Sequence, residues 1–313
     1  MKVAFLFPGQ GAQKVGMGQE LFESSNAARA AFLAADKALD EPLSKLIFEG
    51  PDDRLTLTAN TQPAIVTVSL AALSAFREKT DLMPDFVAGH SLGEFSALVA
   101  AGAMAFEDAV RVTRARGTFM QEAVPPDQGA MAAILGDLSP ETIASICEKV
   151  SQGEVVSPAN FNAPGQVVIS GHKGAVERAG AALAEAGAKK VIPLEVSAPF
   201  HCKLMEPAAK RLETVLKMVA FTDIKVPVVT NVEASPNRDA GRIPELLVRQ
   251  VTAPVRWVES MRTMLDAGVK TFIEFGPGNV LAGLLKRIDK SAQAFSVSTP
   301  GGLEKALETL NKV

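Results

Sequence analysis

One five-residue segment, Gly-His-Ser-Leu-Gly at residues 89–93, restricts the fold of this chain more than any other feature. It follows the short apolar run 85–88, which is typical of a buried strand. It leads into residues 92–101, whose apolar side chains have helical spacing, and Gly102 stands where a helix commonly ends. A serine between glycines in a strand–turn–helix unit is typical of a nucleophile elbow, so the segment predicts serine ester chemistry. The alternative is a glycine-rich turn with a buried serine.

Strand-like and helix-like runs alternate along most of the chain, which predicts an α/β fold with a mainly parallel sheet. Residues 2–7 predict the first strand, which ends in the glycine-rich turn 8–11. A helix is predicted over 60–79, and further strands over 226–231 and 271–275. Together with the elbow, these elements predict an α/β-hydrolase-like core.

The middle of the chain departs from this simple alternation. Between residues 129 and 196 the predicted order is strand, helix, strand, strand, helix, strand. That βαββαβ order is typical of a ferredoxin-like unit. We therefore expect residues 127–197 to form a small domain inserted into a large catalytic domain made of residues 1–126 and 198–313. The cleft between the two domains is the expected substrate site.

The composition excludes several classes of protein. Hydrophobic residues make up 47% of the 313 residues and the net charge is −3, which fits a globular protein and gives no support to nucleic-acid binding. The longest uncharged run, 55–76, is interrupted by polar residues and is a poor match to a membrane span. The two cysteines, Cys147 and Cys202, suggest neither a disulfide framework nor a metal site. We expect a cytoplasmic protein without a bound metal.

A serine hydroxyl becomes nucleophilic only when a base takes its proton, and the chain offers three histidines. His90 adjoins Ser91, so its side chain is expected to point elsewhere in a structural role. His172 lies between a predicted strand and helix of the insert, where a surface loop is expected. His201 follows the insert and lies downstream of the serine, as in the α/β-hydrolase order. We therefore select His201 as the base, although no acid close to it in sequence is a convincing third partner.

The oxyanion of an acyl-transfer intermediate needs preorganised N–H donors. One is expected from the backbone of Leu92, the residue after the nucleophile. A second donor is expected from the turn 8–11. That turn also begins a G-x-G-x-x-G pattern, but Lys14 replaces the third glycine and no suitable acid follows, so dinucleotide binding is disfavoured.

Three arginines lie close together on one predicted helix. Arg111 and Arg114 are expected on its solvated face. Arg116, which is followed by Gly117, is a candidate to point inward. Because a buried guanidinium needs a carboxylate or phosphate partner, a substrate anion should bind Arg116 if no acid of the protein does.

Several segments, in one order and over essentially the whole chain, resemble the malonyl-CoA:acyl carrier protein transacylase family of type II fatty acid synthesis. An ordered set of this kind is far more specific than any single motif. The matching segments are residues 7–11 with Gln13, 61–64, 89–94, 116–117 with 120–121, 160–166, 197–201 and 276–278.

The resemblance implies a role for each candidate residue. Ser91 would carry the malonyl ester and His201 would be the general base. Gln10 and the N–H of Leu92 would form the oxyanion hole, and Arg116 would bind the free malonyl carboxylate. The reaction would be a two-step transfer from malonyl-CoA to acyl carrier protein, with no cofactor and with the CoA thioester as a substrate.

Four further residues follow from the same resemblance. In this family a backbone carbonyl orients the histidine, and the matching segment 248–250 makes Gln250 the candidate. Gln62, Asn160 and Phe200 would contribute to substrate binding. Phe200 looks like the residue of malonyl-preferring acyltransferases in multidomain synthases, whereas many free-standing members carry a smaller residue. It would tighten the pocket against a branched acyl group.

The resemblance also implies a partner surface. The carrier protein of this family is acidic, so a basic patch near the cleft is expected, with Lys189-Lys190 and Lys286-Arg287 as candidates. We expect a monomer that binds neither nucleic acid nor membranes. Three alternatives remain open: an acyltransferase of a polyketide pathway with a related acyl-CoA, a serine hydrolase or thioesterase, and a non-catalytic carrier-protein-binding domain.

Overall fold

Strand β1 (Lys2–Phe7) lies at the centre of the larger sheet in the computed structural model, which describes residues 2–310. It is buried at every position except Lys2, as expected for a continuous apolar strand covered on both faces. The sheet has the order β10-β9-β1-β2-β7-β8, and every pair is parallel except β7 with β8. The other strands are β2 (Phe86–Gly89), β7 (Val228–Val229), β8 (Pro236–Asn237), β9 (Val269–Phe275) and β10 (Gln293–Val297). The predicted α/β class and mainly parallel sheet are confirmed.

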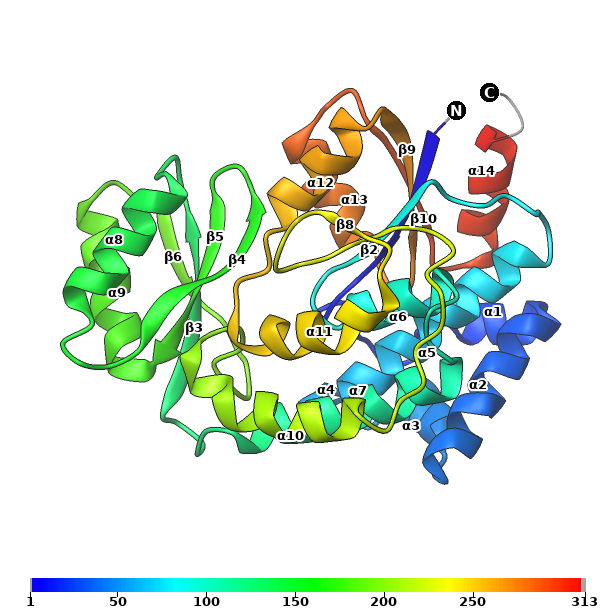
Figure 1. Cartoon of the computed structure of the whole chain (residues 1–313), viewed down its shortest axis with the longest axis horizontal. Coiled ribbons are helices and arrows are strands. Elements are labelled where there is room, and N and C mark those ends of the chain that lie inside the picture. The colour runs from blue at the N-terminus through cyan, green and yellow to red at the C-terminus, as the bar shows by residue number, and fades with distance from the viewer. Residues whose placement is uncertain (1, 311–313) are drawn as a thin grey trace.

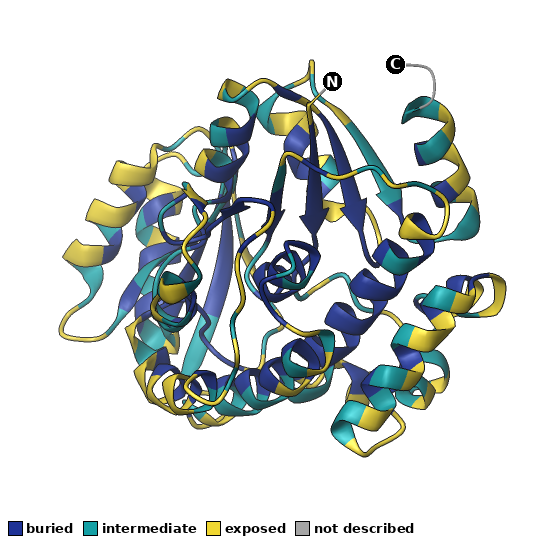
Figure 2. Ribbon diagram, turned by 45° about the vertical axis from the view of Figure 1, so that its right-hand side comes forward, coloured by how far each residue is buried: buried dark blue, intermediate teal, exposed yellow. Residues whose placement is uncertain are grey.

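Helices cover both faces of this sheet, so its central strands are deeply buried (Figure 2). Phe5 of β1 packs edge-on against the last turns of α5 (Thr58–Arg77). Leu6 points to the opposite face, where it joins the core formed with α12 (Trp257–Asp266) and α13 (Val280–Ile288). This alternation follows from the two-residue period of a strand. The other helices around this sheet are α1 (Gln19–Ser24), α2 (Asn26–Leu39), α3 (Leu43–Glu49), α4 (Asp52–Thr56), α6 (Gly93–Ala100), α7 (Phe106–Glu122), α10 (Glu206–Leu216), α11 (Ile243–Thr252) and α14 (Pro300–Leu310).

Helix α5 was predicted over 60–79 and runs from Thr58 to Arg77, with Pro63 inside it. A proline has no N–H to donate to the carbonyl four residues earlier, which here is that of Ala59. The Ala59 carbonyl instead accepts a hydrogen bond of 2.9 Å from Nη1 of Arg114 on α7. Arg114 is therefore partly buried between two helices, and its predicted place on a solvated face is wrong.

The insert forms a separate antiparallel sheet to one side of the larger unit, coloured green in Figure 1. Its strand order, β4-β5-β3-β6, is that of a ferredoxin-like unit, and the predicted βαββαβ order is confirmed. Helices α8 and α9 pack on one face of this sheet, and the other face turns toward the larger unit. The elements are β3 (Gly129–Leu135), α8 (Pro140–Val150), β4 (Val156–Ala163), β5 (Gln166–His172), α9 (Lys173–Glu185) and β6 (Lys190–Pro193).

Two predicted strands are shorter than the apolar patterns indicated. The strand predicted over 226–231 is only β7, because the chain turns out of the sheet after Val229 and Ala234 donates back to the carbonyl of Thr230. The strand predicted over 190–196 ends at Pro193, and residues 194–197 line a cavity instead. Both segments thus leave a sheet to reach the candidate site. No helix within residues 2–310 has the length and apolar character needed to cross a bilayer.

Candidate active site

Ser91 lies in the turn between β2 and α6 with a φ of 51°, in the left-handed region. The turn is tight: a Cβ on Gly89 would lie 1.9 Å from backbone atoms of Gly93, and one on Gly93 would lie 2.2 Å from the carbonyl oxygen of Phe7. Only glycine fits at either position. The left-handed conformation costs roughly 1–2 kcal/mol for a serine. The Asn231 side chain offsets that cost, because its Oδ1 accepts a hydrogen bond of 2.7 Å from the Ser91 N–H and its Nδ2 donates one of 2.7 Å to the carbonyl oxygen of Gly89.

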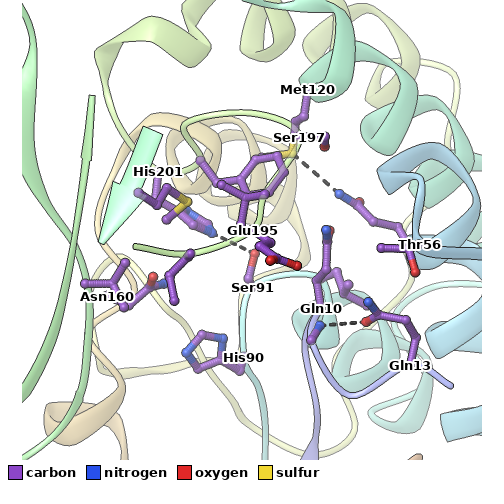
Figure 3. A pocket seen from close by; sticks show the side chains of 18 of the residues that line it. Gln10, Gln13, Thr56, His90, Ser91, Met120, Asn160, Glu195, Ser197 and His201 are labelled. Carbon is purple, nitrogen blue, oxygen red and sulfur yellow. Dashed lines mark hydrogen bonds between the residues drawn. The ribbon is translucent and has the colours of Figure 1, made fainter. Parts of the chain in front are cut away.

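His201 is the histidine that reaches the nucleophile. Its Nε2 lies 2.8 Å from Ser91 Oγ (Figure 3). Its Nδ1 lies 2.9 Å from the backbone carbonyl oxygen of Gln250. A carbonyl can only accept a hydrogen bond, so the ring proton lies on Nδ1 and Nε2 is free to accept the serine proton. The arrangement is a Ser–His dyad steadied by a main-chain carbonyl.

Arg116 places a positive charge beside the hydroxyl oxygen of Ser91. Its side chain is 1% exposed, and Nη1 donates to Gln62 Oε1 at 2.8 Å. Nη2 donates to Gln250 Oε1 at 2.9 Å and to Ser91 Oγ at 3.1 Å. Within residues 2–310 no carboxylate lies at ion-pair distance from this guanidinium, so an anionic substrate group is its natural partner. The prediction that Arg116 points inward is correct.

Burial sets the charge state of both groups. Desolvation, followed by the positive charge of Arg116, lowers the pKa of His201 to about 3. Desolvation also lowers the pKa of Arg116 to about 10, which still leaves the guanidinium charged near neutral pH. The site therefore holds a neutral imidazole ready to accept a proton beside a permanent cation.

Two main-chain N–H groups border the elbow. The N–H groups of Leu92 and Gln10 have no hydrogen-bond acceptor within the described part of the chain. The side chain of Gln10 donates to Thr58 Oγ1 at 3.2 Å, so its main chain is the part left for an oxyanion. A Cβ on Gly9 would lie 2.6 Å from the carbonyl oxygen of His90, which places the 8–11 turn directly against the elbow.

A cavity of about 450 Å³ opens onto these groups, lined by loops and helices of the larger unit and by strands β3, β4 and β5 of the small sheet. Gln250 lies behind Arg116 and does not line it. Figure 3 shows Ser91, His201, Gln10 and Asn160 around this space. The predicted site residues that line the cavity are Gln10, Gln62, Ser91, Leu92, Arg116, Asn160, Phe200 and His201.

Residues 4–309 match the model of the acyl transferase domain family. The chain is 51% identical over 312 residues to the malonyl CoA-acyl carrier protein transacylase of Bacillus subtilis, covering 99% of this chain and 98% of that protein. It is 48% identical to the protein of the same name from Escherichia coli K12, covering 97% of this chain and 98% of the relative. The chain is a member of the malonyl CoA-acyl carrier protein transacylase family. The family predicted from sequence is confirmed.

Solved structures of related transacylases superpose on nearly the whole of this chain. The malonyl CoA-acyl carrier protein transacylase of Coxiella burnetii superposes with a TM-score of 0.97 at 43% identity, covering 99% of this chain and 98% of the other. A malonyl-transacylase solved in complex with a type II polyketide synthase acyl-carrier protein gives a TM-score of 0.96 at 45% identity, covering 99% and 100%.

The other two histidines of the transacylase are engaged elsewhere. His90 Nε2 lies 2.8 Å from Asn162 Oδ1 on β4, and Figure 3 shows its ring directed away from Ser91. This agrees with the structural role predicted for it. His172 Nδ1 accepts a hydrogen bond of 2.9 Å from the backbone N–H of Val155, so it is held within the insert rather than free on a surface loop.

Two residues that organise the site were not predicted from sequence. Asn231 holds the elbow from the end of β7, 140 residues away. Glu94 is 2% exposed and accepts hydrogen bonds at Oε2 from Asn231 N at 3.0 Å and from Gln250 Nε2 at 2.8 Å. A signal was present only for Glu94, since an acid at an otherwise apolar helix start is unusual. Nothing local to Asn231 marks its role.

Proposed function

We propose that this transacylase transfers the malonyl group of malonyl-CoA to the pantetheine thiol of acyl carrier protein through an ester on Ser91. One observation carries the proposal. Ser91 Oγ lies within hydrogen-bond distance of both the neutral base His201 and the buried cation Arg116, which lacks a carboxylate partner in the described structure. A nucleophile, a base and an anion-binding group thus meet at a single atom.

In the first half-reaction Ser91 Oγ attacks the thioester carbonyl carbon, and its proton passes to His201 Nε2. The resulting oxyanion accepts hydrogen bonds from the N–H groups of Leu92 and Gln10. The carbon–sulfur bond then breaks and His201 returns the proton to the departing CoA sulfur. A malonyl-serine ester remains, with its free carboxylate still ionised, and the Nδ1–H bond to the Gln250 carbonyl keeps the imidazole oriented throughout.

The second half-reaction runs the same steps in reverse with a different thiol. His201 takes the proton of the pantetheine thiol, the sulfur attacks the malonyl ester, and the Ser91 oxygen leaves with that proton. Because the acyl group waits on the enzyme between two thiols, the kinetics are expected to be ping-pong. Arg116, held by Gln62, binds the malonyl carboxylate in both steps, while Asn160 and Phe200 line the space for the rest of the substrate.

Intact-mass analysis after mixing with malonyl-CoA, acetyl-CoA and methylmalonyl-CoA in separate reactions tests this function. Malonyl-CoA is expected to give a single covalent adduct that persists in water and disappears when carrier protein bearing pantetheine is added. A hydrolase would lose the adduct without the carrier, and a non-catalytic binding domain would form none. Either result would overturn the proposal.

We propose fatty acid synthesis as the pathway, because the sequence motifs resemble the transacylase family of type II fatty acid synthesis. A second candidate is supply of malonyl groups to a polyketide synthase. It is favoured by the malonyl-transacylase solved with a type II polyketide synthase carrier protein, which is 45% identical to this chain. Discharge of the malonyl-enzyme onto the two kinds of carrier protein, compared at equal concentration, separates these two uses.

The basic residues suggested as a carrier-protein contact differ in whether other groups of the protein already bind their side chains. Lys189 pairs with Asp137 at 2.9 Å, and Arg287 donates to the carbonyl of Pro164. Lys190 and Lys286 are exposed and have no ion-pair partner in the region the structure describes. We therefore assign contact with an acidic carrier protein to these two lysines.

Charge reversal of both lysines, Lys190→Glu with Lys286→Glu, is expected to raise the KM for carrier protein several-fold, because like charges slow association. The rate of Ser91 acylation by malonyl-CoA should not change. Steady-state kinetics with varied carrier protein measures the effect, and Lys45→Glu on the distant helix α3 is the matched control. An equal rise in KM for the control would contradict the assignment.

The low pKa of His201 predicts an unusual pH profile. The folded-state pKa of about 3 means that the base form is fully present above roughly pH 4. The single-turnover rate of Ser91 acylation at saturating malonyl-CoA should therefore stay flat from pH 7 to pH 5. With a histidine of ordinary pKa, the rate would fall about 25-fold over the same range. A decline centred near pH 6.5 would contradict the geometry proposed for this base.

The location and assembly of the transacylase belong to the same proposal. Every catalytic group comes from one chain, which supports a monomer, and the composition supports a cytoplasmic protein. We keep residues 127–197 as the inserted domain and residues 1–126 with 198–313 as the catalytic domain. Light scattering and limited proteolysis measure the assembly and the boundaries.

A further inference from the structure

Arg116 and Glu94 are two buried charges joined by a single neutral side chain. The guanidinium donates to Gln250 Oε1 at 2.9 Å, and Gln250 Nε2 donates to Glu94 Oε2 at 2.8 Å. Arg116 is 1% exposed and Glu94 is 2% exposed. The amide is therefore polarised from both ends, with its oxygen toward the cation and its nitrogen toward the carboxyl group.

No other charge in the described structure competes for this pair. The helix α6 that carries Glu94 packs against β1, β2, β7, α5 and α7, and of these only α7 brings a charged group, Arg116, to the carboxyl. The other buried titratable groups at the site are His201 and His90, whose pKa values are lowered by burial so that both are neutral near pH 7. The charged side chains on the surrounding elements that face elsewhere are Lys2, Arg77, Glu107, Asp108, Arg111, Arg114, Glu122, Glu245 and Arg249.

The carboxyl group of Glu94 is partly protonated and partly ionised near neutral pH. Burial raises its pKa to about 7, while the hydrogen bonds from Asn231 and Gln250 and the charge of Arg116 act in the opposite direction. A second anion bound to the guanidinium would neutralise the positive charge of Arg116, which in the free enzyme favours the ionised form of Glu94. Two negative charges in one desolvated site disfavour each other, so the weaker acid would be protonated.

We propose that Glu94 is the counter-charge of Arg116 in the free enzyme and takes up one proton from solvent when the carboxylate of a malonyl group binds the guanidinium. The inference deepens the proposed function and rests on the assignment of Arg116 to that carboxylate. No covalent bond of Glu94 forms or breaks. Its role is to set the charge of the acyl pocket, which makes it a specificity-determining residue.

The affinity for malonyl-CoA is expected to depend on pH in one direction. In the free enzyme Glu94 is neutral below about pH 7 and ionised above it, so above pH 7 malonyl binding must draw in a proton. The dissociation constant for malonyl-CoA is then expected to rise by up to about tenfold per pH unit above pH 7. Acetyl-CoA carries the same CoA phosphates but no acyl carboxylate, so its dissociation constant should lack this rise.

Single-turnover acylation between pH 6 and 9, with malonyl-CoA and acetyl-CoA varied in parallel, measures both constants. Wild-type enzyme should lose malonyl preference as pH rises. Glu94→Gln should keep the tight low-pH constant for malonyl-CoA at every pH. The matched control is Glu274→Gln, a buried glutamate held by the N-terminus of α13 outside the cavity, which should retain the wild-type pH dependence. The same pH dependence in wild type and Glu94→Gln, or none in wild type, would overturn the proposal.

A measurement on wild-type enzyme alone covers the case in which Glu94→Gln does not fold. Malonyl loading at pH 7.5 in weak buffer with an indicator dye should take up about three quarters of a proton per Ser91 ester, since a carboxyl group with a pKa of about 7 is ionised to that extent at this pH and the released CoA thiol stays mostly protonated. Loading without proton uptake would overturn this inference and leave the role of Arg116 intact. If Arg116→Ala instead keeps full malonyl preference, the proposed role of Arg116 itself fails, so the two failures are distinguishable.

Discussion

Ser91→Ala is expected to abolish the malonyl adduct and to reduce malonyl transfer by about 10⁴-fold or more, because no other hydroxyl can occupy the position of Oγ. That oxygen is held by His201 on one side and Arg116 on the other. The elbow itself should survive the change, since Asn231 binds the main chain of residues 89 and 91 and does not bind the serine hydroxyl. Intact-mass analysis and a transfer assay give the two readouts.

Ser96→Ala is a matched control for this variant. Ser96 lies on α6, the helix that follows the elbow, is fully buried, and its hydroxyl has no hydrogen-bond partner within the described residues. Its loss removes the same atoms without touching the dyad, so adduct formation should persist. A malonyl adduct that survives in Ser91→Ala would refute the assignment of the nucleophile.

Arg116→Ala is expected to reverse the acyl preference, with malonyl use falling and acetyl use rising. A site built around a buried charged donor discriminates against an acyl group that lacks the carboxylate by roughly 10⁴ in analogous polar sites, and most of that ratio should vanish. The change leaves the dyad in place, because His201 is held by the Gln250 main chain and not by the guanidinium. Relative kcat/KM values for malonyl-CoA and acetyl-CoA measure the loss.

Arg111→Ala on the same helix is the control for that experiment. Arg111 is exposed and pairs with Asp108 at 2.8 Å, so its removal should leave the ratio of the two substrates unchanged. If Arg116→Ala keeps the wild-type ratio, a different group binds the malonyl carboxylate.

The parts of the site that could be predicted are those that local sequence encodes. Five consecutive residues encode the elbow, because a Cβ on either glycine would lie within 3 Å of backbone atoms and no other residue fits. The insert is encoded by its own alternation of strands and helices, which needs no knowledge of the rest of the chain. His201 was found by elimination among three histidines, a choice that the 2.8 Å distance to Ser91 supports.

The parts that could not be predicted depend on contacts between distant segments. Asn231 and Glu94 meet through a hydrogen bond between residues 137 positions apart, and no local pattern in the sequence pairs them. Arg114 was misplaced for a related reason. Its partner is the Ala59 carbonyl, which Pro63 leaves without an N–H donor within α5. This hydrogen bond can form only when α5 and α7 pack together.

Gln250 serves the base and the acyl pocket through different parts of the same residue. Its main chain holds the base, so any residue at this position that keeps the helix can supply the same carbonyl. Its side chain binds Arg116 and Glu94 and also donates to the carbonyl oxygen of Ser91 at 3.1 Å, so its identity affects both the acyl pocket and the elbow. Neither contact that holds His201 in place involves Arg116, so substitutions at position 116 can change the acyl group that binds while the Ser–His dyad stays in place. A family of such enzymes can therefore acquire new acyl substrates without an inactive intermediate.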